Sequence, residues 1–346
     1  MLLLSAGLWS CNREQKAAAK GDQPILVKIA DKYGYIDQQG NKAFPQLFDH
    51  AAIFSEGLAA VRVGDKDGYI DRSGKLAIPA SFDAASIFLD GLAAVKIGDR
   101  WGYIDKTGEI AISTRFLATF AFTDGLASVA AVAKDGIKLG YIDKTGKLVV
   151  APEFDDGSFF FEGLAPVKKG SKYGYIDRSG KMAIPPAFDD AQPFRGGLAS
   201  VKVNGRYGNW GFIDKSGKMA IAAQFQNVTM FSEGVAAVKK PGNSWYLIDK
   251  SGSQAIGRGF ATPPVFSEGL AAVREGAKWG FMDKSGAMVI TPQFDAASIF
   301  VNGLAPVKLG DKCGFIDKTG KTVIRPEFEW APNILDQYVS YYSMLH

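Results

Sequence analysis

The chain has 346 residues, of which 47% are hydrophobic, so it is long enough to bury a large core. The 40 basic and 36 acidic side chains leave a formal net charge of only +4. This balance argues against nucleic-acid binding, which requires a concentrated basic face. Two cysteines and two histidines supply few metal ligands, and we expect neither a metal nor another cofactor.

Residues 1–11 form an apolar segment, MLLLSAGLWSC, that is too short to span a bilayer as a helix. Its last four residues, LWSC, resemble the lipobox of bacterial lipoproteins, in which the cysteine is lipidated after signal cleavage. Trp9 departs from that pattern, since a small residue is usual there, and no basic residues precede the apolar run. We predict a lipoprotein signal segment with Cys11 as the lipidated residue. A plain secretory remnant and a buried or disordered N-terminus are the alternatives.

Residues 12–24 (NREQKAAAKGDQP) are polar and alanine-rich, which is typical of a flexible or weakly helical linker. We interpret them as a tether between the membrane and the rest of the chain. The predicted location is therefore the cell envelope, with the protein facing the periplasm or the cell surface; secretion is the alternative. The membrane contact would be the lipid on Cys11.

A repeated unit begins at Ile25, and Phe88–Gly108 (FLDGLAAVKIGDRWGYIDKTG) is its clearest copy. An apolar residue followed by the Asp of a D-x-x-G turn recurs at intervals of 34 to 38 residues. Self-similarity at a nearly fixed period indicates a repeat architecture, and nine copies fill residues 25–332. The turn aspartates are Asp37, Asp71, Asp105, Asp143, Asp177, Asp214, Asp249, Asp283 and Asp317.

Each copy predicts three short strands joined by tight turns. In the third copy, Leu92–Ile97 alternates apolar and polar residues, and Trp101–Asp105 is rich in aromatic and β-branched residues. Glu109–Ile112 follows the D-x-x-G turn as the third strand. The Asp of that turn accepts backbone N–H bonds two residues on, and its Gly supplies a positive φ. The Gly of the W-G step is expected to mark a bulge or a close packing contact.

A second phenylalanine follows the third strand at a fixed phase, just before an acidic residue, Asn or Gly that precedes a Gly. Residues at one phase of a stacked repeat form a continuous core between copies, because a single unit cannot bury its apolar face alone. These phenylalanines are Phe54, Phe88, Phe194, Phe231, Phe266 and Phe300.

The repeats begin and end in the same phase, so no half-sheet at one end complements the other. Nine units also exceed the roughly four to eight of closed propellers. We therefore predict an all-β tandem array of about nine three-stranded β-meander repeats, propeller-like or superhelical and incompletely closed. An open β-solenoid is the alternative. Residues 333–346 leave the pattern and are interpreted as a C-terminal capping tail.

Copies such as GLAAVKIGDRWGYIDKTG (91–108) and GLAAVREGAKWGFMDKSG (269–286) resemble the bacterial WG-repeat proteins over about 300 residues. The resemblance implies an all-β repeat protein, often in the cell envelope, with no catalytic activity and no defined ligand. The sequence departs from the family pattern in the seventh copy and where Trp is replaced by Tyr33, Asp67, Leu139, Tyr173 or Cys313.

The residues themselves do not suggest an enzyme. His50 and His346 have no neighbouring nucleophile and acid in the sequence, and Cys313 occupies the Trp position of its repeat, as a packed thiol would. Asp155-Asp156 and Asp189-Asp190 are the candidate carboxylate pairs for glycoside hydrolysis, yet both extend the repeated P-x-F-D motif. We expect no catalytic, cofactor-binding or metal-binding residues.

The leading hypothesis is a non-enzymatic envelope protein whose extended surface binds a protein or an envelope glycan. The alternatives are a carbohydrate-active enzyme or toxin-like effector on a repeat scaffold, and a structural spacer. Variable features are the best candidates for function: the turns, the insertions near 132–138 and 208–209, and the irregular seventh copy. One row of basic turn residues is a candidate edge for anionic ligands. The alternative is that these residues are solvated and only keep the strand edges from aggregating. They are Arg72, Lys106, Lys144, Arg178, Lys215, Lys250, Lys284 and Lys318.

Overall fold

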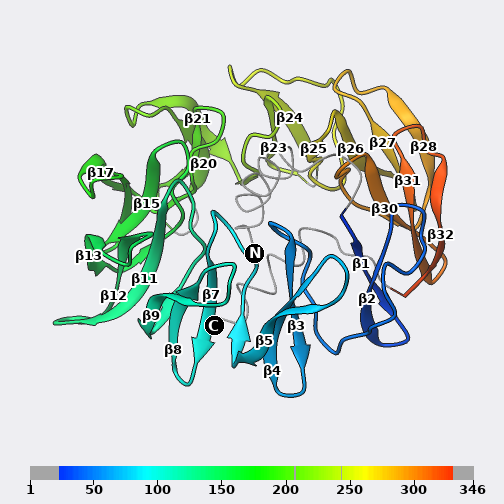
Figure 1. The fold of residues 1–346 in the computed structure, drawn as a ribbon. Helices are drawn as coiled ribbons and strands as arrows, with labels where there is room; N and C mark the ends of the chain where they lie inside the picture. Colours follow the sequence, from blue (N-terminus) through cyan, green and yellow to red (C-terminus); the bar gives the residue numbers. More distant parts are fainter. Residues whose placement is uncertain (1–22, 206–207, 243, 330–346) are drawn as a thin grey trace. The chain divides into compact units, whose positions relative to one another are not determined.

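The computed structural model describes residues 23–205, 208–242 and 244–329 (Figure 1). All regular secondary structure in these residues is β-strand, arranged in antiparallel sheets of two to four strands. Within the same residues there is no helix long and apolar enough to span a membrane. The predicted all-β, propeller-like repeat fold is confirmed. The predicted signal segment, the tether up to residue 22 and the C-terminal tail lie outside the described residues.

The first four repeats supply short strands separated by tight turns. In chain order the strands are β1 (Ile25–Ile29), β2 (Lys32–Ile36), β3 (Leu58–Val63), β4 (Lys66–Asp71), β5 (Leu76–Phe82), β6 (Ala84–Ala85), β7 (Ala93–Ile97), β8 (Arg100–Ile104), β9 (Ile110–Phe116), β10 (Ala118–Thr119), β11 (Leu126–Ala133), β12 (Gly136–Asp143), β13 (Leu148–Phe154) and β14 (Asp156–Gly157).

The remaining repeats follow the same order. Their strands are β15 (Leu164–Lys169), β16 (Lys172–Asp177), β17 (Met182–Phe188), β18 (Asp190–Ala191), β19 (Ala199–Val203), β20 (Asn209–Ile213), β21 (Met219–Phe225), β22 (Asn227–Val228), β23 (Val235–Lys239), β24 (Trp245–Asp249), β25 (Phe266–Ser267), β26 (Leu270–Glu275), β27 (Lys278–Met282), β28 (Met288–Phe294), β29 (Ala296–Ala297), β30 (Leu304–Leu309), β31 (Lys312–Asp317) and β32 (Thr322–Phe328).

A typical sheet takes three strands from one repeat and a short fourth strand from the repeat before. In the third repeat, β7 pairs with β8 and β8 with β9, which is the predicted meander. The strand β6 follows Phe82-Asp83 of the second repeat and pairs with β7 through Ala84 and Ala85. The sequence did not predict this strand, because two residues are too few to carry a strand pattern. Consecutive repeats are therefore joined by hydrogen bonds as well as by their core.

The glycine of the W-G step allows the third strand to approach the second. A methyl group on Gly102 would lie 2.5 Å from the carbonyl oxygen of Ile112 and 2.8 Å from the backbone nitrogen of Thr114. The register between β8 and β9 shifts on either side of Tyr103, so the predicted irregularity is present. Equivalent backbone contacts occur at Gly68, Gly140, Gly174, Gly211, Gly280 and Gly314.

The seventh repeat has Tyr246 in place of this glycine and has no continuous third strand. In the described residues, its second strand β24 makes two isolated bridges to the following segment, from Trp245 and from Ile248. The first repeat shows the same arrangement although it keeps Gly34, so the glycine permits close pairing without ensuring it. Ile256 remains buried, and the seventh repeat keeps its core despite the lost pairing.

The phenylalanine that follows each third strand packs between repeats, as predicted. Phe88 is completely buried, and its ring centroid lies 4.9 Å from that of Tyr69. The Tyr69 hydroxyl donates a hydrogen bond to the carbonyl oxygen of Ser86 at 2.7 Å, which satisfies a buried polar group. Both rings share one core cluster with Val95 and Ile104 of the next repeat. The core is therefore continuous from one repeat to the next.

The turn aspartates are structural, as predicted. Asp105 Oδ1 accepts hydrogen bonds from the backbone nitrogens of Thr107 (2.9 Å) and Glu109 (3.2 Å), and Gly108 has a φ of 89°. The Thr107 hydroxyl donates to the same oxygen at 2.6 Å. The other eight turn aspartates accept the same two backbone bonds.

These hydrogen bonds predict a loss of stability in acid. The hydroxyl of Thr107 and the backbone N–H groups hold the pKa of Asp105 below its ordinary value of 3.8, and seven further turn aspartates with Ser or Thr at the same place behave alike. A carboxyl group whose pKa is lower in the folded state stabilises the fold above its unfolded pKa. That stabilisation is lost as the pH falls through the folded pKa.

We therefore expect the unfolding temperature at constant ionic strength to fall steadily between about pH 5 and pH 2. Circular dichroism at several pH values measures it. The variant Asp105→Asn/Asp143→Asn has two fewer titrating turns and should show a shallower decline. An unfolding temperature that stays constant down to about pH 2 would contradict the assigned role of the turns.

The described chain divides into two compact units, residues 23–154 with 311–314 and 323–329, and residues 155–310 with 315–322. In the first unit, the backbone nitrogen of Glu329 donates to the carbonyl oxygen of Lys28 at 3.2 Å. Asp83 makes the same bond to Lys96 of the next repeat. Figure 1 shows the end of β32 beside β1 and β2.

Side-chain contacts also show that the first and ninth repeats meet as consecutive repeats do. A methyl group on Gly40 of the first repeat would lie 3.0 Å from Cγ2 of Ile324 in the ninth, as one on Gly108 would lie 2.8 Å from Cγ2 of Ile78. The expectation that the two ends of the repeat region do not complement each other is therefore wrong. The physical reason is that each repeat contacts the next through the segment that follows its third strand. The ninth repeat contacts the first in this way through Glu329, and no extra strand at either end of the chain is needed.

This contact predicts that Ile324→Ala destabilises the protein as much as Ile78→Ala, by about 2–4 kcal/mol each. Both isoleucines are at most 2% exposed and pack on a turn glycine of a neighbouring repeat. Urea unfolding of the two variants measures the comparison. If Ile324→Ala were nearly neutral while Ile78→Ala were not, the first and ninth repeats would not pack together in solution.

Candidate ligand-binding surface

One end of each sheet carries a second kind of tight turn, between the repeat's last phenylalanine and the next first strand. Glu56 and Gly57 have φ angles of 51° and 89° and connect Ser55 to Leu58, whose backbones exchange two hydrogen bonds. Positive φ at both central residues defines a type I′ turn. A non-glycine residue is uncommon in this conformation. It recurs at Asp90, Asp124, Glu162, Glu233, Glu268 and Asn302.

The acidic residue of such a turn links three consecutive repeats. Glu233 of the sixth repeat accepts hydrogen bonds from the backbone nitrogen of Gly269 in the seventh, at 3.2 and 3.3 Å. Its carboxylate also pairs with Nζ of Lys284 in the eighth repeat at 3.1 Å, and Lys284 donates to its carbonyl oxygen at 3.0 Å. Glu268, Gly303 and Lys318 repeat this arrangement one unit later.

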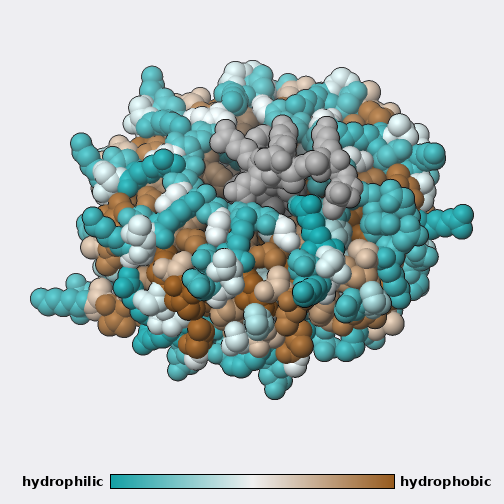
Figure 2. All heavy atoms as spheres, viewed as in Figure 1, coloured by the Kyte–Doolittle hydropathy of each residue, from teal (hydrophilic) through white to brown (hydrophobic). Residues whose placement is uncertain are grey.

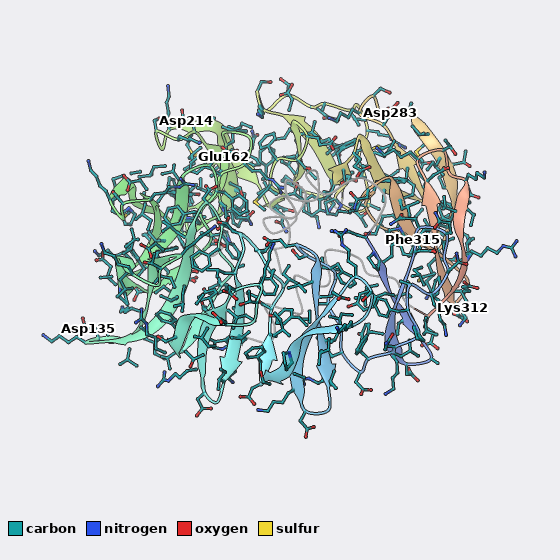
Figure 3. The ribbon with its side chains drawn as sticks, viewed as in Figure 1. Asp135, Glu162, Asp214, Asp283, Lys312 and Phe315 are labelled. Carbon is teal, nitrogen blue, oxygen red and sulfur yellow. The ribbon has the colours of Figure 1, made fainter. Side chains whose placement is uncertain are left out.

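The predicted basic edge lies within this network. Figure 3 shows Glu162 near the turn of Asp214, which precedes Lys215. Five members of the edge pair with an acidic residue two repeats earlier: Lys106 with Glu56 (2.7 Å), Lys144 with Asp90 (2.6 Å), Lys215 with Glu162 (3.4 Å), Lys284 with Glu233 (3.1 Å) and Lys318 with Glu268 (3.0 Å).

Of the other three members, Arg178 also interacts with neighbouring groups. Arg72 and Lys250 form no ion pair within the residues that the structure describes. Exposed ion pairs contribute about 0–1 kcal/mol each, so the network adjusts local charge more than stability. Most of the edge is charge-neutral, and its binding to an anionic polymer stays a prediction.

A second polar group lies at the opposite end of the sheets, on the short edge strands. Asp156 of β14 is directly opposite Lys168 of β15, which is opposite Tyr173 of β16. The Tyr173 hydroxyl donates a hydrogen bond to Oδ2 of Asp156, and Lys168 Nζ lies 5.5 Å from the centroid of the tyrosine ring. The Asp156 carboxylate, the Lys168 ammonium and the Tyr173 phenol therefore lie side by side on three neighbouring strands.

Asp190 is the equivalent residue of the next edge strand, β18, and it acts on the same tyrosine. Burial raises the pKa of Asp190, the charge of Asp156 adds to this effect, and Lys202 and Lys168 oppose it. Burial also raises the pKa of Tyr173, with further contributions from its bond to Asp156 and from the charge of Asp190. Asp156 therefore contacts the Tyr173 hydroxyl directly, and the charge of Asp190 acts on it as well. Asp156, Lys168, Tyr173 and Asp190 are called the Asp–Tyr cluster below.

The structure separates the adjacent aspartates that the sequence suggested as carboxylate pairs. Asp189 accepts hydrogen bonds from Nζ of Lys172 (2.6 Å) and from the backbone nitrogen of Gly205 (2.7 Å) in the next repeat. Asp155 binds the backbone nitrogen of Gly170 in the same way, at 2.7 Å. The first aspartate of each pair therefore joins repeats, and only the second belongs to the cluster.

Lys168 and Tyr173 were not predicted from the sequence as site residues. The available signal was a departure from the repeat: an Asp on the edge strand where three other copies have Ala, together with Tyr in place of Trp. Each change alone is ordinary repeat variation, and only the pairing of three strands places them together. The alanines at the equivalent edge-strand position are Ala84, Ala118 and Ala296.

The insertion near residues 132–138 lengthens one hairpin. In β11–β12, Val132 and Ile137 are cross-strand partners with 74% and 64% of their surface exposed. Asp135 lies at the projecting tip (Figure 3). Elsewhere on the face drawn in Figure 2, hydrophobic residues are interspersed with hydrophilic ones. Residues 206 and 207, beside the second insertion, lie outside the described residues.

Two further residues that the sequence singled out, His50 and Cys313, lie within the described residues. His50 lies with its ring centroid 6.2 Å from that of Tyr33, and Cys313 is a half-buried free thiol. Among the described residues, no group of three or more His, Cys, Asp or Glu side chains is placed to hold a metal ion. Cys11 and His346 lie outside the described residues.

Sheets of consecutive meanders, linked by edge strands and a shared core, define a propeller-like β-repeat protein. The family model for the WG containing repeat matches residues 33–66, 68–101, 101–136, 140–173, 173–207, 210–245, 264–279, 279–313 and 314–336. The chain therefore belongs to the WG-repeat family.

Among solved structures, a eukaryotic initiation factor is similar over 89% of this chain and 96% of its own, with a TM-score of 0.61 and 10% identity. BamB from Moraxella catarrhalis is similar over 77% and 90%, with a TM-score of 0.45 and 9% identity. The dihydro-heme d1 dehydrogenase NirN is similar over 92% and 76%, with a TM-score of 0.46 and 13% identity. At these identities the likeness concerns the fold alone. No curated protein matches the sequence significantly.

Proposed function

We propose that this WG-repeat protein is a non-enzymatic binding scaffold tethered to the cell envelope, and that the Asp–Tyr cluster contacts its ligand. The main support is a difference between charged residues that recur in most repeats and charged residues that occur in only one or two. Repeated acids and lysines are occupied in turns and in links between repeats. In the cluster, Asp156 and Asp190 instead lie at an edge-strand position where three other copies have Ala, and neither of them serves a D-x-x-G or type I′ turn.

The ligand class that fits best is a glycan. The carboxylates of Asp156 and Asp190 are acceptors for sugar hydroxyls, and Lys168 and Lys202 supply donors to ring and glycosidic oxygens. The tyrosine adds an aromatic face for the apolar side of a sugar ring. A protein interface would favour a larger patch with an apolar centre, and the cluster is small and polar.

Isothermal titration calorimetry with chitohexaose, maltohexaose and cellohexaose tests this proposal. We expect one of these neutral oligosaccharides to bind, and Asp156→Asn and Tyr173→Ala each to weaken binding at least tenfold. Asp311→Asn is the matched control, because Asp311 is an exposed acid with no ion pair within the described residues. Binding that is equal in all four proteins, or absent for all three sugars, would overturn the glycan assignment.

The envelope location rests on the segment MLLLSAGLWSC. Expression of the full chain in a bacterium supplied with an alkyne-labelled fatty acid tests the lipid anchor. We expect labelled protein in the membrane fraction and unlabelled protein from Cys11→Ser. Label that persists in Cys11→Ser would refute the anchor at this residue, and soluble unlabelled wild type would refute the lipoprotein assignment.

One observation favours a second candidate, a carbohydrate-active enzyme. Burial and the charge of Asp156 raise the pKa of Asp190, and glycosidases use one protonated and one ionised carboxyl group. Release of reducing sugar from the same oligosaccharides distinguishes the two functions. Turnover that is abolished in Asp190→Asn, with the fold intact, would establish the enzyme and refute the non-enzymatic proposal.

A further inference from the structure

We call the repeated contacts of the acidic type I′ turn residue, such as those of Glu233 with Gly269 and Lys284, the turn network. This network is interrupted in the fifth repeat. Its type I′ turn has Gly196, with a φ of 61°, where the neighbouring repeats have Glu162 and Glu233. By the pattern of Glu233, a carboxylate at this position would bind the backbone nitrogen of the turn glycine one repeat on and the turn lysine two repeats on. These groups are Gly234 and Lys250. Both donors are present, and the carboxylate is missing.

Neither donor has found another acceptor. Within the described residues, the Gly234 N–H and the Lys250 ammonium make no hydrogen bond or ion pair, and both residues are exposed. A methyl group on Gly196 would lie 3.1 Å from Nζ and from Cε of Lys250. The lysine therefore extends over the glycine, toward the place that an acidic side chain occupies in other repeats.

The carboxylate that contacts Gly196 is already occupied. Glu162 accepts hydrogen bonds from the backbone nitrogens of Gly196 (2.6 Å) and Gly197 (3.0 Å), and it pairs with Lys215 at 3.4 Å. Glu162 thus binds the turn glycines and the turn lysine that correspond to its own repeat, and within the part of the chain that the structure describes it makes no ion pair with Lys250. Because Gly196 has no side chain, the space is open to a group from outside the chain.

We propose that Gly196, Gly234 and Lys250 form a binding site for the carboxylate of another molecule, namely a glutamate side chain of an acidic peptide. Glutamate is favoured because it fills the equivalent place in four turns of this chain, at Glu56, Glu162, Glu233 and Glu268. The site lies at the end of the sheets that carries the type I′ turns, whereas the Asp–Tyr cluster lies at the opposite end. It therefore does not depend on the proposed function.

One exposed lysine and one N–H group bind a single carboxylate weakly, with a dissociation constant of about 1 mM or higher. A peptide with several glutamates presents several carboxylates to the same site, which raises its apparent affinity. The suitable measurement is therefore an amide NMR titration, which detects weak binding at single residues.

We expect triglutamate to shift the Gly234 amide resonance in a saturable manner, relative to sodium chloride at equal ionic strength. The Gly269 amide is an internal control, because Glu233 already occupies it. In Gly196→Glu the chain supplies its own carboxylate, so the Gly234 response should disappear while the other resonances stay in place. Lys250→Gln should weaken the response at least threefold.

The converse variant tests the same rule. Glu233→Gly removes a resident carboxylate and should make the Gly269 amide respond to triglutamate as Gly234 does. A Gly234 shift that survives in Gly196→Glu, or that sodium chloride reproduces, would refute the site. Stronger binding of oligogalacturonate than of triglutamate would refute the peptide as the ligand and assign the site to acidic sugars.

Discussion

Gly102→Ala is expected to lower the free energy of unfolding by about 3 kcal/mol. The added methyl group would lie 2.5 Å from the carbonyl oxygen of Ile112 and 2.8 Å from the nitrogen of Thr114. These are backbone atoms of β9, so relief requires the third strand to move away and to give up its pairing with β8. Urea unfolding followed by circular dichroism measures the change.

The control for this prediction is Gly257→Ala. Gly257 has no atom of another segment within 4 Å of an added methyl group and does not adopt a positive φ, so the substitution should be nearly neutral. Hydrogen exchange should show lost protection in β8 and β9 of the Gly102 variant. If the two variants were equally stable, the W-G glycine would not be required for close strand pairing.

Phe88→Ala should be at least as damaging, with a loss of about 3–5 kcal/mol. The side chain is completely buried, packs against Tyr69, and shares one core cluster with Val95 and Ile104 of the next repeat. Its removal leaves a cavity between two repeats, so we expect hydrogen exchange to increase in the sheets of both the second and the third repeat.

Tyr69→Phe provides the comparison for Phe88→Ala. The sixth and eighth repeats already have Phe212 and Phe281 at the tyrosine position, with their phenylalanine partners 5.0 and 4.9 Å away. Tyr69→Phe should therefore lose only the hydrogen bond to Ser86, about 1 kcal/mol. A Phe88→Ala effect confined to the second repeat would contradict a core that is continuous between repeats.

The repeat period, the three strands, the D-x-x-G turns and the phenylalanine core could be predicted from the sequence. These features are local or recur many times, and repetition makes a pattern visible even where single copies deviate. The turn aspartates show this most directly. A catalytic acid is needed once, but the same aspartate appears in nine copies, and in each it accepts backbone bonds within its own turn.

The candidate sites could not be predicted in the same way. Lys168 and Asp156 are 12 positions apart in the chain and meet only because β14 pairs with β15. The basic edge was recognised from the sequence, but its neutralising acids lie about 50 residues away, as Glu233 lies from Lys284. Such distances cannot be read from a pattern, because the number of repeats between two partners is set by how the sheets stack.

The sequence by itself determined the repeat, its strands and its core positions, since hydrophobic phase and turn chemistry act over a few residues. Only the tertiary structure decided how the repeats are joined. It showed the fourth strand, the contact of Glu329 with Lys28, and the role of one carboxylate across three repeats. It also showed that Gly196 leaves Gly234 and Lys250 without their acid. These features depend on groups brought together by sheet stacking, which the order of residues along the chain does not reveal.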